Sequence, residues 1–358
     1  MAINESGLKN YLENKFGGKL NSFTMSTLGR GCLGIGYLLE FEINDKKYRK
    51  ILKSLYTEHL GKEYSADRAQ SLILAHSSYA LMEHHIRSMD VIGLEKDGEM
   101  ISVGNAEEFF ILMDEAGGTD YFNDLKKIGQ SGTLNDADKN KAAILARFLA
   151  NLHKKKFNKG SLYKRKIRDT IGSGESIMGI MDMYPPNLDW FPEKTQIKIV
   201  QKAVEFWMKD KYRVGRLCRV HGDFHPGNIW FKNAADFILL DRARGEFGEP
   251  ADDVTALAIN FIFYSLIYQG DFSGALKELA GIFIKEYFKL SGDKEMEKVI
   301  APYWAFRAAI LCNPSFYPDS FFENSGKAIK VRKKIINFAL RTLDAKKFSW
   351  RKITNYLK

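Results

Sequence analysis

The first part of the chain alternates apolar segments with turn-forming residues, which is the pattern of β-strands joined by tight turns. In "FTMSTLGRGCLGIGYLLEFEI", residues 23–43, a glycine-rich turn separates two apolar segments. The turn residues Asn44-Asp45 then precede "KKYRKILKSL" at 46–55. The pattern predicts three strands between about residues 21 and 55, the first two joined as a glycine-rich hairpin.

A helix and one more strand are predicted before the pattern changes. Ser65 is a favourable first residue for the helical apolar spacing of "SADRAQSLILAHSSYALMEHH" at 65–85. The apolar run "EEFFILMDE" at 107–115 predicts a strand that ends before Gly117-Gly118.

After Gly117-Gly118 the apolar residues recur mostly with helical spacing. The clearest case is 136–153, where one face carries Ala142, Leu145, Ala146, Leu149 and Leu152. Further helices are expected near 194–209, 250–268, 273–290, 294–311 and 325–345. A small β-rich part followed by a larger, mostly helical part predicts an α+β fold with two lobes, residues 1–116 and 117–358.

Composition favours a globular intracellular protein. Of the 358 residues 45% are hydrophobic and 27% are charged, enough apolar material for a large core. The apolar run at 254–268 is too short to span a bilayer and predicts a buried helix. The first residues contain no apolar segment typical of a secretion signal, and three scattered cysteines do not suggest a disulfide framework or a zinc site. We therefore expect a cytoplasmic location.

The net charge of +10 belongs to the end of the chain. Residues 327–358 hold eleven Lys or Arg and one acid, Asp344, so the remainder has no net charge. Apolar residues recur there at helical spacing, which predicts an amphipathic helix with a solvated basic face. Contact of this basic tail with an anionic membrane surface or a nucleic acid is the alternative. The rest of the chain has no strong sign of nucleic-acid binding.

The segment "RVHGDFHPGNIWF" at 219–231 concentrates polar and turn residues between apolar ones. Asp223 precedes Asn228 by five residues, and Asp241 ends the apolar segment "FILLD" thirteen residues after Asn228. Phosphoryl transfer needs a carboxylate for the acceptor hydroxyl, and carboxylate and amide oxygens for Mg²⁺. The spacing suits these roles, although the two aspartates are alternatively turn-capping carboxylates.

Residues 220–231 together with "FILLDRARGEFGEPADDVTALA" resemble the catalytic signature of the aminoglycoside phosphotransferase and choline kinase superfamily. The resemblance covers about Leu28 to Ala258. It implies a protein-kinase-like two-lobed fold and transfer of the γ-phosphate of ATP, with Mg²⁺, to a hydroxyl of a small polar molecule. It also implies that Asp223 is the catalytic base and that Asn228 and Asp241 bind the metal. His221 would support the loop, and His225 has no role in the signature.

The nucleotide-binding residues are expected in the first lobe. Gly29, Gly31 and Gly34 form G-x-G-x-x-G in a predicted hairpin, which suits a loop covering phosphates rather than a dinucleotide site. A glycine-rich hairpin without a ligand is the alternative. Lys53, at the end of a strand, is the candidate for the α- and β-phosphates, and Lys50 is a substitute.

Two further nucleotide contacts follow from the resemblance. The acid that pairs with Lys53 is expected from the next helix, either Asp67 or Glu63. Backbone groups of residues 112–115, which include Met113 and Asp114, would meet adenine.

The sequence departs from related kinases after Asp241, where it continues Arg-Ala-Arg. Arg242 or Arg244 would contact a phosphate or an acidic group of the substrate. Alternatively they pair with nearby acids, namely Glu246, Glu249, Asp252 and Asp253. In the family signature the residue at Asp253 fixes the catalytic loop to the next helix.

The acceptor is expected to be a small molecule, because only eight residues separate Asp241 from Pro250 and leave little room for a peptide-docking segment. The segments 172–191 and 303–318 mix aromatic and charged residues and are candidates for its binding site. They hold few acids, so we expect an acceptor less cationic than an aminoglycoside. A non-catalytic nucleotide-binding protein, or a basic-tailed adaptor, remains the rival reading. The sequence does not indicate the oligomeric state.

Overall fold

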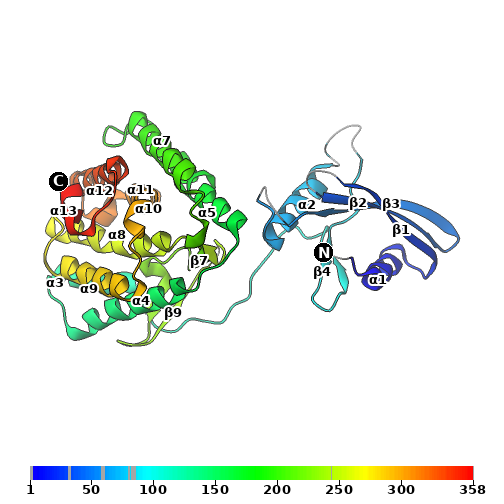
Figure 1. Ribbon diagram of the computed structural model, residues 1–358, viewed down its shortest axis with the longest axis horizontal. Helices are drawn as coiled ribbons and strands as arrows, with labels where there is room; N and C mark the ends of the chain where they lie inside the picture. Colours follow the sequence, from blue (N-terminus) through cyan, green and yellow to red (C-terminus); the bar gives the residue numbers. More distant parts are fainter. Residues whose placement is uncertain are drawn as a thin grey trace. The chain divides into compact units, whose positions relative to one another are not determined.

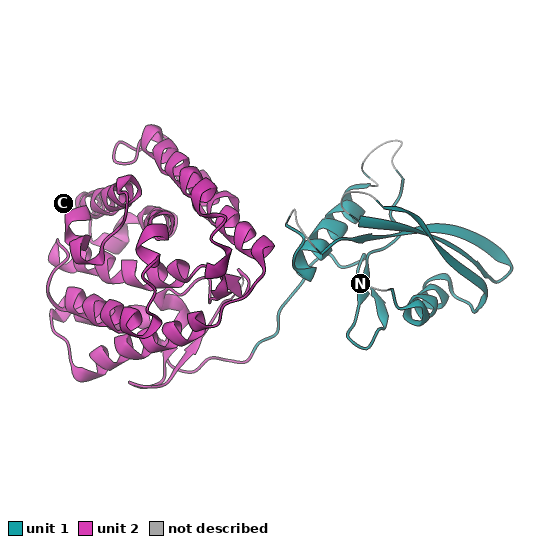
Figure 2. Cartoon of the chain, viewed as in Figure 1, with its two compact units in different colours: residues 1–113 teal, residues 114–358 magenta. Residues whose placement is uncertain are grey.

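The computed structural model describes residues 3–30, 34–57, 61–79, 81, 86–242 and 244–357. The chain divides into two compact units, unit 1 (residues 1–113) and unit 2 (residues 114–358), coloured separately in Figure 2. The sequence placed this division after residue 116. The α+β fold class is confirmed: unit 1 is built on an antiparallel sheet, and unit 2 is mostly helical.

Unit 1 consists of one helix packed on a three-stranded sheet, a second helix and a small hairpin (Figure 1). Apolar side chains of α1, among them Leu8 and Leu12, form a core with Leu39, Phe41 and Ile43 of the sheet. The elements are α1 (Glu5–Phe16), β1 (Leu20–Arg30), β2 (Gly34–Ile43), β3 (Lys46–Leu55), α2 (Ser65–Tyr79), β4 (Ile92–Leu94) and β5 (Met100–Ser102).

The three predicted strands are confirmed, and the turn between the second and third explains the register of that pair. Asn44 and Asp45 both have positive φ, 51° and 57°. Two consecutive residues of this kind suit the tight turns whose twist matches that of the flanking strands. The turn therefore brings Ile43 opposite Lys46, and the antiparallel pairing continues to Gly34 opposite Leu55.

The prediction of a strand at residues 107–115 is wrong. These residues form no strand, and Leu112 is fully exposed. An apolar run has the composition of a strand, but a strand also needs a neighbouring edge that accepts its backbone hydrogen bonds. The three-stranded sheet pairs only its own members, in the order β1-β2-β3, so this run has no partner there.

Unit 2 is a set of helices around the buried helix α8. Its α-helices are α3 (Tyr121–Ser131), α4 (Asp136–Lys154), α5 (Gly160–Gly172), α6 (Ile177–Asp182), α7 (Glu193–Asp210), α8 (Pro250–Gln269), α9 (Gly274–Ser291), α10 (Met296–Val299), α11 (Ala301–Cys312), α12 (Ser325–Asp344) and α13 (Ile353–Tyr356). Short 3₁₀ helices are η1 (Val214–Arg216), η2 (Pro226–Asn228), η3 (Asp319–Phe322) and η4 (Trp350–Lys352).

Helix α8 is the buried helix that the sequence predicted. Almost all its residues are buried, and it packs against α3, α9 and α11. Among the described residues it alone is long and apolar enough to cross a membrane, but 94% of the relevant window is buried within the protein. Burial of this kind is typical of a core helix.

Two short sheets position the polar loop between β7 and β8, residues 220–228. One pairs β7 (Cys218–Arg219) with β10 (Phe247–Gly248). The other has the order β6-β8-β9, with β6 (Thr119–Asp120), β8 (Ile229–Phe231) and β9 (Phe237–Leu239). The loop therefore begins at one sheet and ends at the other, and both of its ends are held.

Candidate active site

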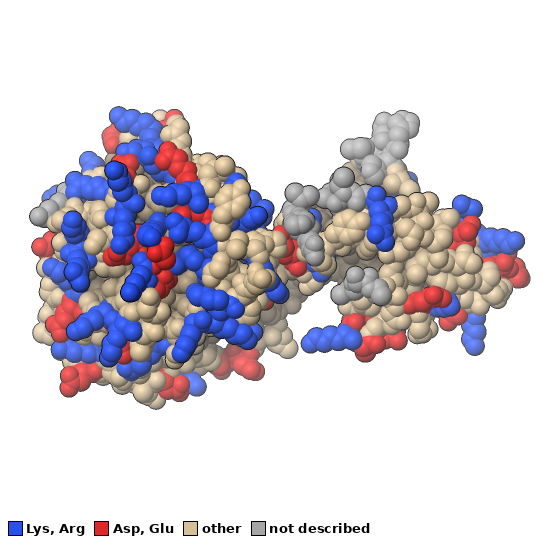
Figure 3. Space-filling model, viewed as in Figure 1, with Lys and Arg blue, Asp and Glu red and all other residues tan. Residues whose placement is uncertain are grey.

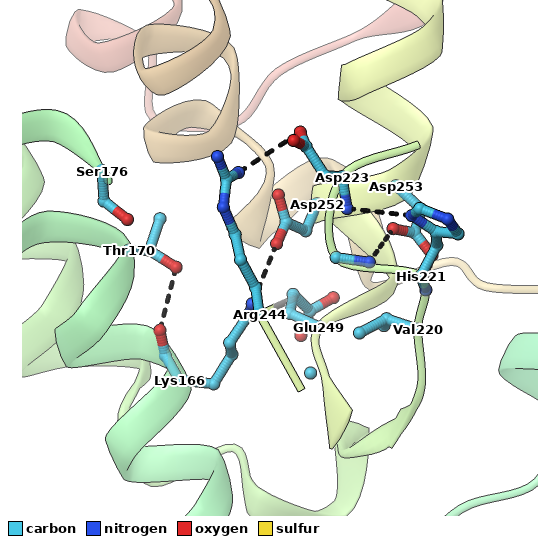
Figure 4. A network of polar contacts seen from close by, with 12 residues as sticks. Lys166, Thr170, Ser176, Val220, His221, Asp223, Arg244, Glu249, Asp252 and Asp253 are labelled. Atoms are coloured by element: carbon cyan, nitrogen blue, oxygen red, sulfur yellow. Dashed lines mark hydrogen bonds and ion pairs between the residues drawn. The ribbon is translucent and has the colours of Figure 1, made fainter. Parts of the chain in front are cut away.

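The start of the loop is anchored to helix α8 through Asp253. The Asp253 carboxylate accepts the backbone N–H of His221 at 2.7 Å and that of Gly222 at 2.8 Å; Figure 4 shows Asp253 beside His221. The same carboxylate lies 3.1 Å from His153 Nε2. Burial raises the pKa of Asp253, but the bonds from His153 and His221 outweigh it and hold the pKa below its ordinary value. The structural role expected for Asp253 is confirmed.

The backbone of Asp223 is held by three neighbours in the same loop. Its N–H donates to His221 Nδ1 at 3.3 Å. Its carbonyl accepts from His225 N at 2.9 Å and from Asn228 Nδ2 at 3.0 Å. The supporting role expected for His221 fits this contact. These bonds fix the direction of the Asp223 side chain without using its carboxylate.

Two arginines contact that carboxylate. Arg307 Nη1 donates to Asp223 Oδ1 at 2.5 Å, and Arg244 Nη1 donates to the same oxygen at 3.3 Å (Figure 4 draws the Arg244 contact). Burial raises the pKa of Asp223, whereas the charges of Arg307 and Arg244 lower it, and the net result lies below the ordinary value. Asp223 is therefore an ionised carboxylate at neutral pH.

Arg307 belongs to a buried ion-pair network. Its side chain lies on α11 and is 4% exposed, and Nη2 donates to Asp252 Oδ1 at 2.6 Å and to Gly222 O at 3.2 Å. Lys166 of α5 lies 3.4 Å from the other Asp252 oxygen. The network joins α5, α8 and α11 to the loop, so packing of the helices determines where Asp223 lies.

His225 is partly exposed and neutral. Its Nδ1 accepts the Gly227 N–H at 3.1 Å, and its Nε2 is 3.9 Å from Asp223 Oδ2. Burial lowers the pKa of His225; Asp223 opposes this effect, and Arg307 and Arg244 add to it. The imidazole therefore has a turn-capping contact.

Asn228 and Asp241 are brought together by the hairpin of β8 and β9. Ile229 pairs with Leu239, and the Leu240 N–H donates to the Asn228 carbonyl at 3.0 Å. Asn228 uses its amide nitrogen for Asp223, and neither its Oδ1 nor the exposed Asp241 carboxylate has a hydrogen-bond partner among the described residues. Asp241 has φ 50°, uncommon for a residue with a side chain. Two hard oxygen donors are thus available on one hairpin.

A cavity of about 590 Å³ lies in unit 2 beside Asp223. Both segments selected from the sequence contribute to its wall: Gly174, Glu175, Ile180 and Met183 from 172–191, and Arg307, Ile310, Leu311, Phe316 and Tyr317 from 303–318. The remaining wall residues are Phe122, Asp223, His225, Arg244, Ala256, Ile259 and Asn260. The volume suits a small organic molecule.

The two arginines after Asp241 have different partners from those considered in the sequence. Arg242 donates to the backbone carbonyls of Val220, at 3.0 and 2.7 Å, and of Glu246. Arg244 contacts Glu175 and Asp223. Pairing with the carboxylates of Glu246, Glu249, Asp252 or Asp253 is not found for either one. Arg242 supports the loop, and Arg244 faces the cavity.

Two of the three glycines proposed for the nucleotide, and the lysine, lie in the sheet of unit 1. Gly29 is in β1 and Gly34 begins β2, whereas Gly31 lies outside the described residues. A Cβ on Gly34 would come within 2.0 Å of Ser54 O, so close strand pairing already requires this glycine. Lys53 on β3 is exposed and makes no ion pair within the described residues.

Of the other residues predicted to contact the nucleotide, Asp67 and Met113 lie in unit 1, and Asp114 begins unit 2. Asp67 lies in the first turn of α2, where its Oδ2 accepts the Tyr64 N–H at 2.8 Å. Met113 and Asp114 lie in the segment predicted as a strand, which has no strand pairing. The nucleotide roles of these residues stay predictions.

Sequence reasoning missed three charged residues of the site: Lys166, Asp252 as a partner of Arg307, and Glu175 as a partner of Arg244. Arg307 lies 84 positions from Asp223, so no local motif joins them. For Asp252 the one available signal was a charged residue in the otherwise apolar helix α8.

No family model and no curated protein matches the chain. Solved structures do match it. An amicoumacin kinase in complex with AMP-PNP and Ca²⁺ is 17% identical over 93% of each chain, with a TM-score of 0.41. A spectinomycin phosphotransferase in complex with ADP and spectinomycin is 12% identical over 96% of this chain and 99% of its own, with a TM-score of 0.37.

A thermostable mutant of the aminoglycoside phosphotransferase APH(4)-Ia, in its apo form, is 14% identical over 92% of this chain and 98% of its own, with a TM-score of 0.36. Because the TM-scores lie below 0.5, the roles proposed for this protein rest on its own residues.

Proposed function

We propose that the protein is an ATP- and Mg²⁺-dependent kinase that transfers the γ-phosphate to a hydroxyl of a small polar molecule. The observation that carries the proposal is the position of Asp223. Its ionised carboxylate lines a cavity in unit 2, and it belongs to the same short loop as Asn228.

Asp223 has the role of orienting the acceptor hydroxyl and taking its proton. The hydroxyl oxygen forms a bond to the γ-phosphorus as the bond from that phosphorus to the bridging oxygen of ADP breaks, and the proton passes through Asp223 to solvent. The lowered pKa makes Asp223 a weak base. Its main contribution is therefore orientation before transfer, and the proton leaves late in the reaction.

Asn228 Oδ1 and the Asp241 carboxylate are the residues that would hold Mg²⁺. Both are hard oxygen donors without partners among the described residues, which is the donor type that magnesium prefers. When bound, the ion would neutralise charge on the phosphate oxygens. The proposed contacts of the nucleotide are Gly29, Gly31, Gly34, Lys53, Asp67, Met113 and Asp114.

The test compares Asp223→Asn with Asp241→Asn. Asp223→Asn removes the group that takes the proton, so turnover should fall about 10²–10⁴-fold while Mg·ATP affinity changes little. Asp241→Asn removes a negative charge from the metal site, so Mg²⁺ and ATP affinity should fall together. Asn228→Ala should resemble a milder Asp241→Asn. Calorimetric Mg·ATP titration and turnover of a metabolite pool, read by mass spectrometry, measure both quantities.

Circular dichroism of each variant controls for folding. Loss of nucleotide binding in Asp223→Asn, with binding kept in Asp241→Asn, would reverse the two roles. Wild-type binding of Mg·ATP without turnover of any pool component would favour a non-catalytic nucleotide-binding protein instead.

A further inference from the structure

We propose that the acceptor carries an oxyanion, a carboxylate or a phosphate group, in addition to its hydroxyl, and that Arg244 binds this oxyanion. The inference rests on the proposed kinase function and specifies its substrate class. Apart from its charged residues, the cavity wall is mainly apolar, so the acceptor also has an apolar body.

The carboxylates on the cavity wall are already paired with arginine. Asp223 contacts both Arg307 and Arg244, and Glu175 contacts Arg244. A multiply cationic acceptor would therefore find no unpaired carboxylate among the described wall residues. Its positive charges would also lie in a cavity whose wall already holds the guanidinium groups of Arg244 and Arg307.

Arg244 is the wall cation with capacity for a ligand. Its Nε contacts Glu175 Oε2 and its Nη1 contacts Asp223 Oδ1, each at 3.3 Å. Its Nη2 has no hydrogen-bond partner in the part of the chain that is described, and the guanidinium group lies 5.4 Å from the centre of the Phe306 ring. The Glu175 side chain is 70% exposed, and exposed ion pairs contribute little free energy. An oxyanion can replace Glu175 and form a paired hydrogen bond with the planar guanidinium group.

Arg307 differs from Arg244 in this respect. Its two terminal nitrogens are committed to Asp223, Asp252 and Gly222, and its side chain is buried. Arg307 is therefore a positioning residue for Asp223, and Arg244 is left as the group that can exchange partners.

Two substitutions with opposite expected effects test the charge of the acceptor. Arg244→Gln should raise the KM for the acceptor about 10- to 100-fold, the range of a hydrogen bond to a charged group. Glu175→Gln removes the competing carboxylate and should lower that KM. A cationic acceptor would reverse both signs, and that result would overturn the inference.

Controls separate binding of the oxyanion from other effects. Arg244→Lys keeps the charge and should restore part of the affinity. Arg168→Gln removes an arginine that pairs with Asp169 and does not line the cavity, so it should leave the KM unchanged. Arg244 also contacts Asp223, so its loss could change catalysis as well as binding. The quantity compared is therefore a ratio, kcat/KM for the anionic acceptor divided by kcat/KM for a neutral counterpart. The counterpart is an amide where the acceptor is a carboxylate, and an alcohol where it is a phosphate ester. Arg244→Gln should abolish that preference.

The acceptor itself is found by labelling. A nucleotide-depleted metabolite extract is divided by anion exchange at neutral pH, and each fraction is incubated with the wild-type protein and γ-labelled ATP. Labelled product in the retained fraction supports the inference, and the amide or alcohol comparison then distinguishes carboxylate from phosphate. Product only in the unretained fraction overturns the inference but keeps the kinase function. No product in either fraction, with Mg·ATP binding intact, overturns the kinase function itself.

Discussion

The contact of Arg307 with Asp223 determines how burial of the Asp223 carboxylate affects its pKa. A carboxylate near apolar surroundings would normally have a raised pKa, since burial disfavours the charged form. Here two guanidinium groups reverse that effect and keep Asp223 ionised. The same groups stabilise the fold only above the pH at which Asp223 is protonated, so their contribution is lost as the pH falls through its lowered pKa.

Arg307→Met should therefore shift the pH dependence of the reaction. Burial of Asp223 persists without its main counter-charge, so its pKa rises and the acid limb of kcat/KM moves to higher pH. The free energy of unfolding should also fall by about 3–5 kcal/mol, as for a broken buried ion pair. Rates between pH 4 and 8 and denaturant unfolding measure the two effects.

Arg216→Met is a matched control, because Arg216 forms an ion pair with buried Glu249 and with Asp293 and does not line the cavity. It should destabilise the protein without moving the acid limb. An unchanged acid limb in Arg307→Met would show that Arg307 does not set the pKa of Asp223.

Among the elements, helices with local end signals agree best with the sequence. Helix α8 begins at Pro250, after Glu249 caps the Ala251 N–H, and ends before Gly270, which has φ 77°. Helix α4 begins after Asn135, which forms a reciprocal capping box with Asp138. These signals involve residues two to four positions apart, so spacing alone reveals them.

Asn135→Ala should lower the free energy of unfolding of unit 2 by about 1 kcal/mol, the usual effect of losing a side-chain cap. The cap is at the opposite end of α4 from His153, so phosphorylation should not change. Asp138→Ala should have a similar effect, and the double variant should be less than additive because both residues belong to one box. Full additivity in urea unfolding would contradict a coupled cap.

The elements also show where the cations of the basic tail, residues 327–358, lie. Several of its cations have partners within unit 2: Arg332 is buried and pairs with Asp319, Lys347 pairs with Glu297, and Lys334 donates to the Gly270 carbonyl. On the face seen in Figure 3, Lys and Arg of unit 2 are interspersed with Asp and Glu. The amphipathic helix predicted from the sequence is α12, with Ile336 and Leu343 buried on one face.

Over the full chain, the division into two units has a consequence for proteolysis. Residues 109–113 are apolar and exposed and have no strand pairing. Exposed backbone of this kind is a preferred cleavage site. Chymotrypsin should cut there first and release two fragments that correspond to units 1 and 2.

If the backbone of Met113 and Asp114 contacts the nucleotide, Mg·ATP should slow this cleavage, and Asp241→Asn should reduce the protection at the same ATP concentration. Mass spectrometry of early digestion products identifies the site. A first cut inside unit 2 would contradict the expectation, and equal cleavage with and without Mg·ATP would argue against the predicted adenine contact.

The sequence alone was sufficient for features that depend on near neighbours. The hairpin at Asn44-Asp45, the ends of α4 and α8 and the loop from His221 to Asn228 follow from turn chemistry and spacing. The strand prediction at 107–115 failed because a strand needs a neighbouring strand to pair with, and the apolar run does not specify one. The surroundings of Asp223 came only from the folded chain: α11 brings Arg307 to it from 84 positions away, and the 172–191 segment brings Glu175 to Arg244. Ion pairs depend on distance in space, which helix packing determines and sequence separation does not.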